Sequence, residues 1–185
     1  WMMWNWLISC LASNASIFLY DGSPFFPNEE NLFKIIEKEE ITFFGTGAKY
    51  LDLLKQRKIQ INNFYKLNKL KTISSTGSPL IHETFNYVYK KIKKDVHLTS
   101  ISGGTDIVSC FVLGNPNLNV YSGEIQCKGL GMDVDVFNEA GKEINNKKGE
   151  LVCKSSFPSK PLYFWKDINN KKYLYAYFKK YENIW

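Results

Sequence analysis

The sequence predicts an α/β protein, with a mostly parallel sheet flanked by helices and a smaller antiparallel, β-barrel-like subdomain after it. Up to about residue 114, apolar segments of strand length alternate with segments whose apolar residues recur at helical spacing. Beyond that point, short alternating segments are separated by polar turns such as residues 138–141 and 145–148. Crossover helices favour parallel pairing and short turns favour antiparallel pairing, so we place a boundary near Asn115, between domains 1–114 and 115–185.

The elements expected in the first domain follow from periodicity and turn residues. Helices are expected over residues 1–13, 30–39, 48–55 and 82–92, the first of them buried. Strands are expected over residues 16–20, 41–44, 70–75 and 96–101. In an open parallel sheet, ligands bind beyond the carboxyl ends of the strands. Two glycine-containing loops, residues 77–79 and 102–106, are therefore expected at the binding edge.

The second domain is expected to consist of short strands joined by polar turns. These strands are predicted over residues 107–112, 123–128, 133–137 and 150–154. The tail beyond residue 161 is rich in tyrosine and lysine and carries no clear element signal.

Length, charge and hydropathy limit the classes of function that the chain can have. With 185 residues, 44% of them hydrophobic, the chain has material for one sizeable core or two small ones. Its net charge of +6 comes almost wholly from lysine, since Arg57 is the only arginine, and this argues against nucleic-acid readout. The apolar start is interrupted by polar residues before it reaches the length of a membrane span, so no membrane partner is expected. The sequence carries no signal for oligomeric state.

Cysteine usage predicts a reducing, cytoplasmic location. The four cysteines are widely spaced, lie among apolar neighbours and include no Cys-x-x-Cys pair; they are Cys10, Cys110, Cys127 and Cys153. This pattern is typical of buried free thiols.

The loop that follows the strand at residues 96–101 carries the clearest chemical signal. Gly103 and Gly104 remove side chains where a ligand could approach the backbone. Thr105 can donate a hydrogen bond to a phosphate oxygen, and the Asp106 carboxylate can bind Mg²⁺, which prefers oxygen ligands. The same four residues also fit an ordinary β-turn.

Five motifs in order extend this signal along the whole chain. They are WMMWNW at 1–6, SSTGSPL at 74–80, SISGGTDI at 100–107, VYSGEIQ at 120–126 and GELV at 149–152. Together they resemble the adenylate-forming acyl-coenzyme A synthetase superfamily and, within it, the branch that activates acetoacetate. The resemblance implies Mg-ATP, acetoacetate and coenzyme A as substrates, with an acyl adenylate as the intermediate. It also implies that the chain is a fragment of the large N-terminal domain of such an enzyme.

The resemblance assigns roles to individual residues. It implies that the segment lying on the adenine is Gly77, Ser78 and Pro79, and that the strand and loop flanking the base and the acyl group are Ser100, Ile101, Ser102, Gly103 and Gly104. Thr105 matches the residue that bonds the α-phosphate. Asp106 matches the Mg²⁺ ligand, although most of the superfamily has glutamate there. These two residues are the predicted catalytic pair.

The remaining assignments concern the acyl and coenzyme A ends of the site. Trp1, Met2 and Met3 match the wall of the acyl pocket, and Gly47 lies where the pantetheine tunnel passes. Acetyl-CoA synthetases, which the chain also resembles, hold a tryptophan at the position of Gly103. Its absence is expected to make room for a longer acid. The tryptophan cluster at the start also fits a structural core.

The resemblance further implies parts outside these residues. A phosphate loop with a lysine is expected before Trp1. A ribose-binding Gly-Asp pair and a mobile domain with a catalytic lysine are expected after Trp185. We therefore expect the segment alone to be inert. Two alternatives remain open, namely another short-chain acyl-CoA synthetase and a catalytically inert truncated binding module.

Overall fold

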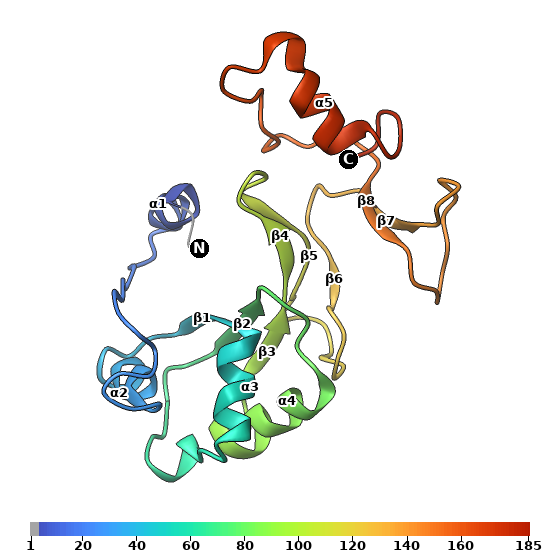
Figure 1. The fold of residues 1–185 in the computed structure, drawn as a ribbon. Coiled ribbons are helices and arrows are strands. Elements are labelled where there is room, and N and C mark those ends of the chain that lie inside the picture. The colour runs from blue at the N-terminus through green and yellow to red at the C-terminus, as the bar shows by residue number, and fades with distance from the viewer. Residues whose placement is uncertain (1–3) are drawn as a thin grey trace. The chain divides into compact units, whose positions relative to one another are not determined.

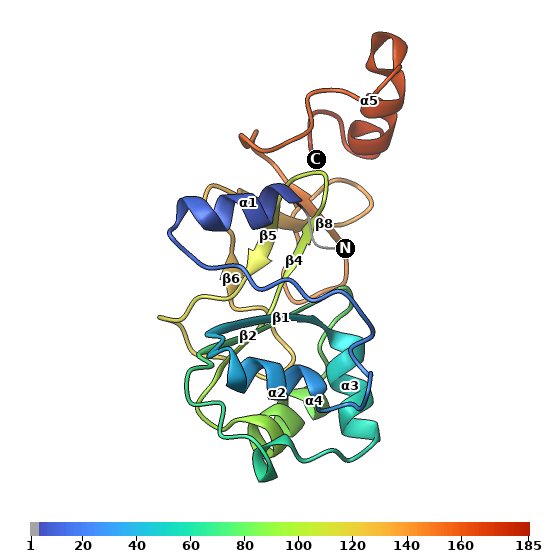
Figure 2. The same ribbon diagram turned by 90° about the vertical axis from the view of Figure 1, so that its left-hand side faces the viewer.

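The structure, a computed structural model, describes residues 4–185 and divides into two compact units (Figures 1 and 2). The parallel-sheet unit comprises residues 17–102 and 113–127. The hairpin unit comprises, among the described residues, 4–16, 103–112 and 128–185. Both units are discontinuous in sequence, so a single cut near Asn115 does not coincide with this division, and the linear domain boundary stays a prediction.

The parallel-sheet unit is built on three strands in the order β1-β2-β3. They are β1 (Phe43–Gly47), β2 (Thr72–Thr76) and β3 (His97–Ser100). Both pairings are parallel, with Gly47 opposite Thr76 and Ser75 opposite Ser100. The predicted parallel sheet is therefore confirmed.

The helices of this unit lie on one side of the sheet in both views. They are α2 (Asn31–Lys38), α3 (Ala48–Gln56) and α4 (His82–Tyr87), and α4 continues into a π-helical turn, η2 (Val88–Ile92); a 3-10 turn, η1 (Ile61–Asn63), follows α3. Each presents an apolar stripe to the sheet, which creates one core. Its fully buried members include Phe33, Leu51, Leu54, Ile73, Phe85 and Leu98.

The hairpin unit contains α1 (Trp4–Ala12), the antiparallel pair β7 (Val134–Phe137) and β8 (Glu150–Cys153), a 3-10 turn η3 (Ile168–Asn170) and α5 (Lys171–Phe178). In the pair, Val134 lies opposite Cys153 and Phe137 opposite Glu150. A further sheet of order β4-β5-β6 comprises β4 (Ser102–Gly104), β5 (Ser109–Leu113) and β6 (Cys127–Lys128). The antiparallel hairpin is confirmed, and closure of these strands into a barrel stays a prediction.

Several expected elements differ in the structure. Of the strand expected over residues 123–128 only Cys127–Lys128 forms β6, and the strand expected over residues 107–112 begins at Ser109. Residues 16–20 form no strand, and Phe18 and Leu19 are exposed. The first helix forms but is not buried where its side chains are described, since Ile8 and Leu11 are more than half exposed. The strand expected over residues 41–44 is β1 at Phe43–Gly47 instead, and it extends through Gly45 because backbone hydrogen bonds need no side chain.

Among residues 4–185, no helix is both long and apolar enough to cross a membrane. The four cysteines are free, as predicted, although only Cys153 is fully buried.

Candidate functional site

The carboxyl ends of β1, β2 and β3 form one edge of the parallel sheet. Because the strands are in register, Gly47 at the end of β1 lies beside Thr76 at the end of β2. The Ile101 N–H donates to the Ser75 carbonyl over 2.9 Å, and the Thr76 hydroxyl donates to the Ile101 carbonyl over 3.4 Å. These contacts hold the first residues beyond β3 against the end of β2.

This edge gathers the predicted site residues of the parallel-sheet unit, namely those assigned to nucleotide binding and Gly47, which is assigned to the pantetheine tunnel. They are Gly47, Gly77, Ser78, Pro79, Ser100, Ile101 and Ser102. The expectation that loops 77–79 and 102–106 both lie at this edge is met for residues 77–79 and Ser102. Residues 103–106 belong to the hairpin unit, and their place at this edge stays a prediction. The individual roles of these residues stay predictions.

Two glycines at this edge differ in what the backbone requires. Gly77 has φ +84°, a conformation that side chains disfavour, and a Cβ there would meet no heavy atom within 4 Å. Gly47 has an ordinary extended conformation with φ −84°, and a Cβ there would lie 3.9 Å from the Thr76 carbonyl oxygen. The turn after β2 therefore needs a glycine, whereas the fold alone does not require one at position 47.

In the hairpin unit, Thr105 and Asp106 lie on a four-residue turn between β4 and β5. Both side chains are exposed, and Val108 closes the turn with φ +48°. The expected loop is thus shorter than predicted, because Ser102–Gly104 is a strand. The structure agrees locally with the β-turn alternative, and that turn presents the hydroxyl and the carboxylate outward.

Gly103 has a structural reason to be glycine. A Cβ there would overlap the Ser109 carbonyl oxygen and lie 2.7 Å from the Cys110 Cα. These atoms belong to the backbone of β5, so no side-chain rotation can relieve the overlap. The close approach of β4 to β5 explains this glycine without reference to an acyl pocket. The idea that Gly103 borders the acyl group stays a prediction.

The Asp106 carboxylate is held at one oxygen, and its other oxygen lies close to the backbone at Gly104. Its Oδ2 accepts a hydrogen bond of 2.5 Å from the Tyr177 hydroxyl. Its Oδ1 lies over Gly104, where a Cβ would come within 2.6 Å of it. Burial, followed by the hydrogen bond to Asp106, raises the pKa of Tyr177 above its ordinary value, so Tyr177 stays protonated and donates. No sequence pattern pointed to Tyr177, which is 71 residues away.

The oxygen ligands on this turn fit a magnesium ion better than a transition metal that is bound by several protein side chains. Among the described residues, no group of three or more His, Cys, Asp or Glu side chains could hold a metal. Mg²⁺ is usually held by one or two carboxylates together with waters and substrate phosphates. One carboxylate, oriented by its hydrogen bond from Tyr177, fits that pattern.

The predicted acyl-pocket residues Trp1, Met2 and Met3 lie outside the described residues. Two other motifs of the sequence have structural roles. The Gln126 amide donates to the carbonyls of Asn115 (3.0 Å) and Leu118 (2.9 Å), which closes the preceding loop. Gly149 packs against β7, where a Cβ would lie 2.8 Å from Val136 Cγ1.

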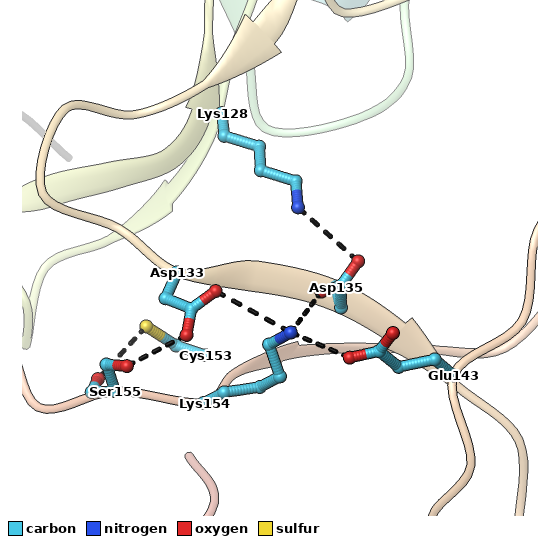
Figure 3. Close-up of polar contacts among 7 residues, drawn as sticks. All are labelled: Lys128, Asp133, Asp135, Glu143, Cys153, Lys154 and Ser155. Atoms are coloured by element: carbon cyan, nitrogen blue, oxygen red, sulfur yellow. Dashed lines mark hydrogen bonds and ion pairs between the residues drawn. The ribbon is translucent and has the colours of Figure 1, made fainter.

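A charged network closes the β7–β8 hairpin (Figure 3). Lys154 Nζ lies 2.6 Å from Asp135 Oδ2, 2.7 Å from Glu143 Oε1 and 3.7 Å from Asp133 Oδ1. Lys128 also pairs with Asp135, over 3.4 Å. The hydrogen bond from Lys154 lowers the pKa of Asp135, and the bonds to Asp135 and Glu143 raise the pKa of Lys154. Lys154 is thus fully engaged within the hairpin, which argues for a structural role.

Comparison with known proteins gives a consistent set of relatives. No family model matches the sequence. The chain is 52% identical over 185 residues to an acetoacetyl-coenzyme A synthetase of Rhizobium meliloti and 49% identical to one of Gallus gallus. Each match covers the whole chain and 28% of the relative. The chain therefore spans about 28% of the length of the curated relatives it matches.

Solved structures agree with these relatives. An acetoacetyl-CoA synthetase from Streptomyces lividans superposes with a TM-score of 0.91 at 36% identity, over 100% of this chain and 29% of that one. An anthranilate CoA ligase, solved with anthranoyl-AMP, superposes over 87% of this chain with a TM-score of 0.69 at 17% identity, which shows the fold alone.

The chain is thus similar along its whole length to part of a class of CoA-ligating enzymes, and it shares its fold with a CoA ligase of much lower identity. Within that class, curated relatives that match along its entire length at 45–52% identity are acetoacetyl-CoA synthetases.

Proposed function

We propose that the natural protein carrying this chain is an ATP-dependent acid–thiol ligase. It activates acetoacetate to an acyl adenylate with release of pyrophosphate, and then transfers the acyl group to coenzyme A with release of AMP. The observation that carries this proposal is the unbroken match, up to 52% identical, with acetoacetyl-CoA synthetases. The position of Gly47 and of the Gly77 loop at the carboxyl edge of the parallel sheet supports it, because nucleotide ligands bind at such edges.

In this proposal each predicted site segment has its own role. The segments 77–79 and 100–104 contact the adenosine and the acyl group, and Gly47 leaves space for the pantetheine arm. Thr105 donates its hydroxyl to the α-phosphate, and Asp106 binds Mg²⁺. When bound, Mg²⁺ neutralises phosphate charge during adenylation. The protein is proposed to act in the cytoplasm, consistent with four free thiols.

The test is acid-dependent exchange of pyrophosphate into ATP by the natural protein, with acetoacetate, acetate, propionate and butyrate compared at equal concentration. We expect acetoacetate to give the highest kcat/KM. A preference for another of these acids would favour a different short-chain acyl-CoA synthetase. Exchange with none of them, despite ATP binding, would favour an inert binding module.

A further inference from the structure

The Asp106 carboxylate is anchored by a residue from a distant element. Tyr177 lies on α5, and its hydroxyl meets Asp106 Oδ2 at 2.5 Å within the hairpin unit. Asp106 itself is exposed on a turn, where an unanchored side chain would populate several rotamers. A single short hydrogen bond to an ionised acceptor is among the stronger restraints a side chain can receive.

Tyr177 is itself fixed by aromatic packing. Its ring stacks on Trp185 with centroids 3.8 Å apart and planes 15° apart, and it meets Tyr173 edge-on at 5.2 Å. Trp185 exchanges two backbone hydrogen bonds with Cys153 of β8, at 2.9 and 3.2 Å. The ring of Tyr177 is thus tied to the hairpin, and its hydroxyl has a defined direction.

The start of α5 is also tied down. Asp167 accepts hydrogen bonds from the N–H groups of Lys172 (2.9 Å) and Tyr173 (2.8 Å). Such bonds satisfy the free donors of the first helical turn. A continuous series of contacts therefore runs from β8 and the start of α5, through Tyr177, to the carboxylate.

We propose that Tyr177 is a positioning residue that holds the Asp106 carboxylate in the orientation in which it binds the divalent cation of the nucleotide substrate; this rests on the proposed function. A carboxylate has about four lone-pair sites, so a bond to Tyr177 leaves others free for a cation. Groups that hydrogen-bond a metal ligand typically change metal affinity or activity by about 10–100-fold when removed.

The test compares two hydroxyl deletions on the same helix in the natural protein. Tyr177→Phe keeps the ring and its stack but removes the bond to Asp106. Tyr175→Phe is the matched control, because the Tyr175 hydroxyl bonds only Lys179 Nζ, at 2.8 Å, in the contacts described, and its side chain is 65% exposed. The probe is Mn²⁺. Its binding is measured by electron paramagnetic resonance, with ATP present and without the carboxylic acid substrate.

We expect Tyr177→Phe to weaken Mn²⁺ binding about 10–100-fold and Tyr175→Phe to leave it unchanged. The Mg²⁺ concentration needed for half-maximal pyrophosphate exchange should rise in the same proportion. In an Asp106→Ala background, Tyr177→Phe should change the residual Mn²⁺ affinity by less than about twofold, because a positioning residue acts only through its partner.

If the Mn²⁺ affinity of Tyr177→Phe equalled that of the wild-type protein, the proposal would be overturned, whether or not the variant is less stable. Tyr177 would then be a packing residue. The proposal would also be overturned if Tyr177→Phe lowered the Mn²⁺ affinity of Asp106→Ala by a further factor of about 10–100. Failure of the proposed function would give a different result. The wild-type protein would then not activate acetoacetate, although its binding of Mn²⁺ and ATP could still depend on Tyr177.

Discussion

The contact between β4 and β5 makes a sharp prediction for Gly103→Ala. The added methyl group would lie 2.7 Å from the Cys110 Cα and would overlap the Ser109 carbonyl oxygen. Carbon atoms in contact normally lie about 3.5–4.0 Å apart, so β4 and β5 must separate by about 1 Å. Because both contacted atoms are backbone, the strain cannot be relieved by a rotamer change.

The expected cost follows from two opposing effects. Overpacking typically costs ~1–3 kcal/mol, and the lower entropy of the unfolded alanine chain returns ~0.4–1 kcal/mol. Taking the middle of each range, the net local destabilisation is about 1.3 kcal/mol, which corresponds to roughly 10-fold faster amide exchange wherever exchange proceeds by local opening. The measurement is hydrogen–deuterium exchange of a peptide that contains β5, in the natural protein.

Gly45→Ala is the matched control. Gly45 also lies in a strand, but a Cβ there would have only one neighbour within 4 Å, Phe43 Cε1 at an ordinary 3.8 Å. Exchange in β1 should therefore change little. If β5 exchanged no faster in Gly103→Ala than in the wild-type protein, the steric reasoning would be refuted.

This outcome bears on substrate choice. A tryptophan at position 103 is larger than alanine and would meet the same backbone of β5. A loss of acetoacetate activation in Gly103→Trp would then report a disturbed hairpin as readily as a filled pocket. Only if Gly103→Ala leaves β5 intact does Gly103→Trp become a clean test of whether the missing indole makes room for acetoacetate.

Two further predictions concern polar contacts that shape each unit. Lys154→Met removes the partner of three carboxylates, so we expect a lower thermal midpoint at pH 7 than in Lys180→Met, whose lysine pairs only with Glu150 at 2.6 Å; equal midpoints would contradict this. The pKa of Asp135 is lowered from 3.8, so its stabilising contribution is present above pH 3.8 and is lost as pH falls through its folded pKa. Lys154→Met should flatten that acid dependence in a thermal-melt series from pH 5 down to about pH 2. Gln126→Ala should open the 115–119 loop and raise the amide hydrogen exchange rate of that loop. Gln56→Ala, which loses a surface contact of 2.7 Å to Asp52, should leave this rate unchanged. Equal exchange rates of the loop in the two variants would refute the role of Gln126 in closing it.

The parallel sheet and its edge could be predicted because the signals are local. Helical stripes such as Tyr50, Leu51 and Leu54 are buried as their spacing predicts. Turn glycines mark where β2 ends. These patterns depend on neighbours within about one turn of helix or one strand, so the sequence correctly predicted that loop 77–79 follows a strand at the carboxyl edge of the sheet, whereas most of loop 102–106 belongs to the hairpin unit.

The parts that could not be predicted depend on distant or absent partners. The Tyr177–Asp106 bond joins residues 71 positions apart, and α5 has little apolar contrast between its faces. The apolar run at 16–20 resembled a strand, but β-structure needs a paired neighbour, and none is present there among the described residues. Gly103 was interpreted through the chemistry of a pocket because the backbone of β5 cannot be seen in a linear motif.

The shorter carboxylate at position 106 is best understood together with the Tyr177 hydroxyl that holds it and the glycine beside it. Glutamate has one more rotatable bond than aspartate and loses more side-chain entropy when it is fixed. Aspartate is cheaper to hold in place but reaches one methylene less far. In this chain Gly104 leaves room for Oδ1 against the backbone, and Tyr177 holds Oδ2 from the opposite end of the unit's sequence. Under the proposed cation-binding role, reach is thereby exchanged for a fixed orientation, because the Tyr177 hydroxyl lies at hydrogen-bond distance from the carboxylate of the short side chain.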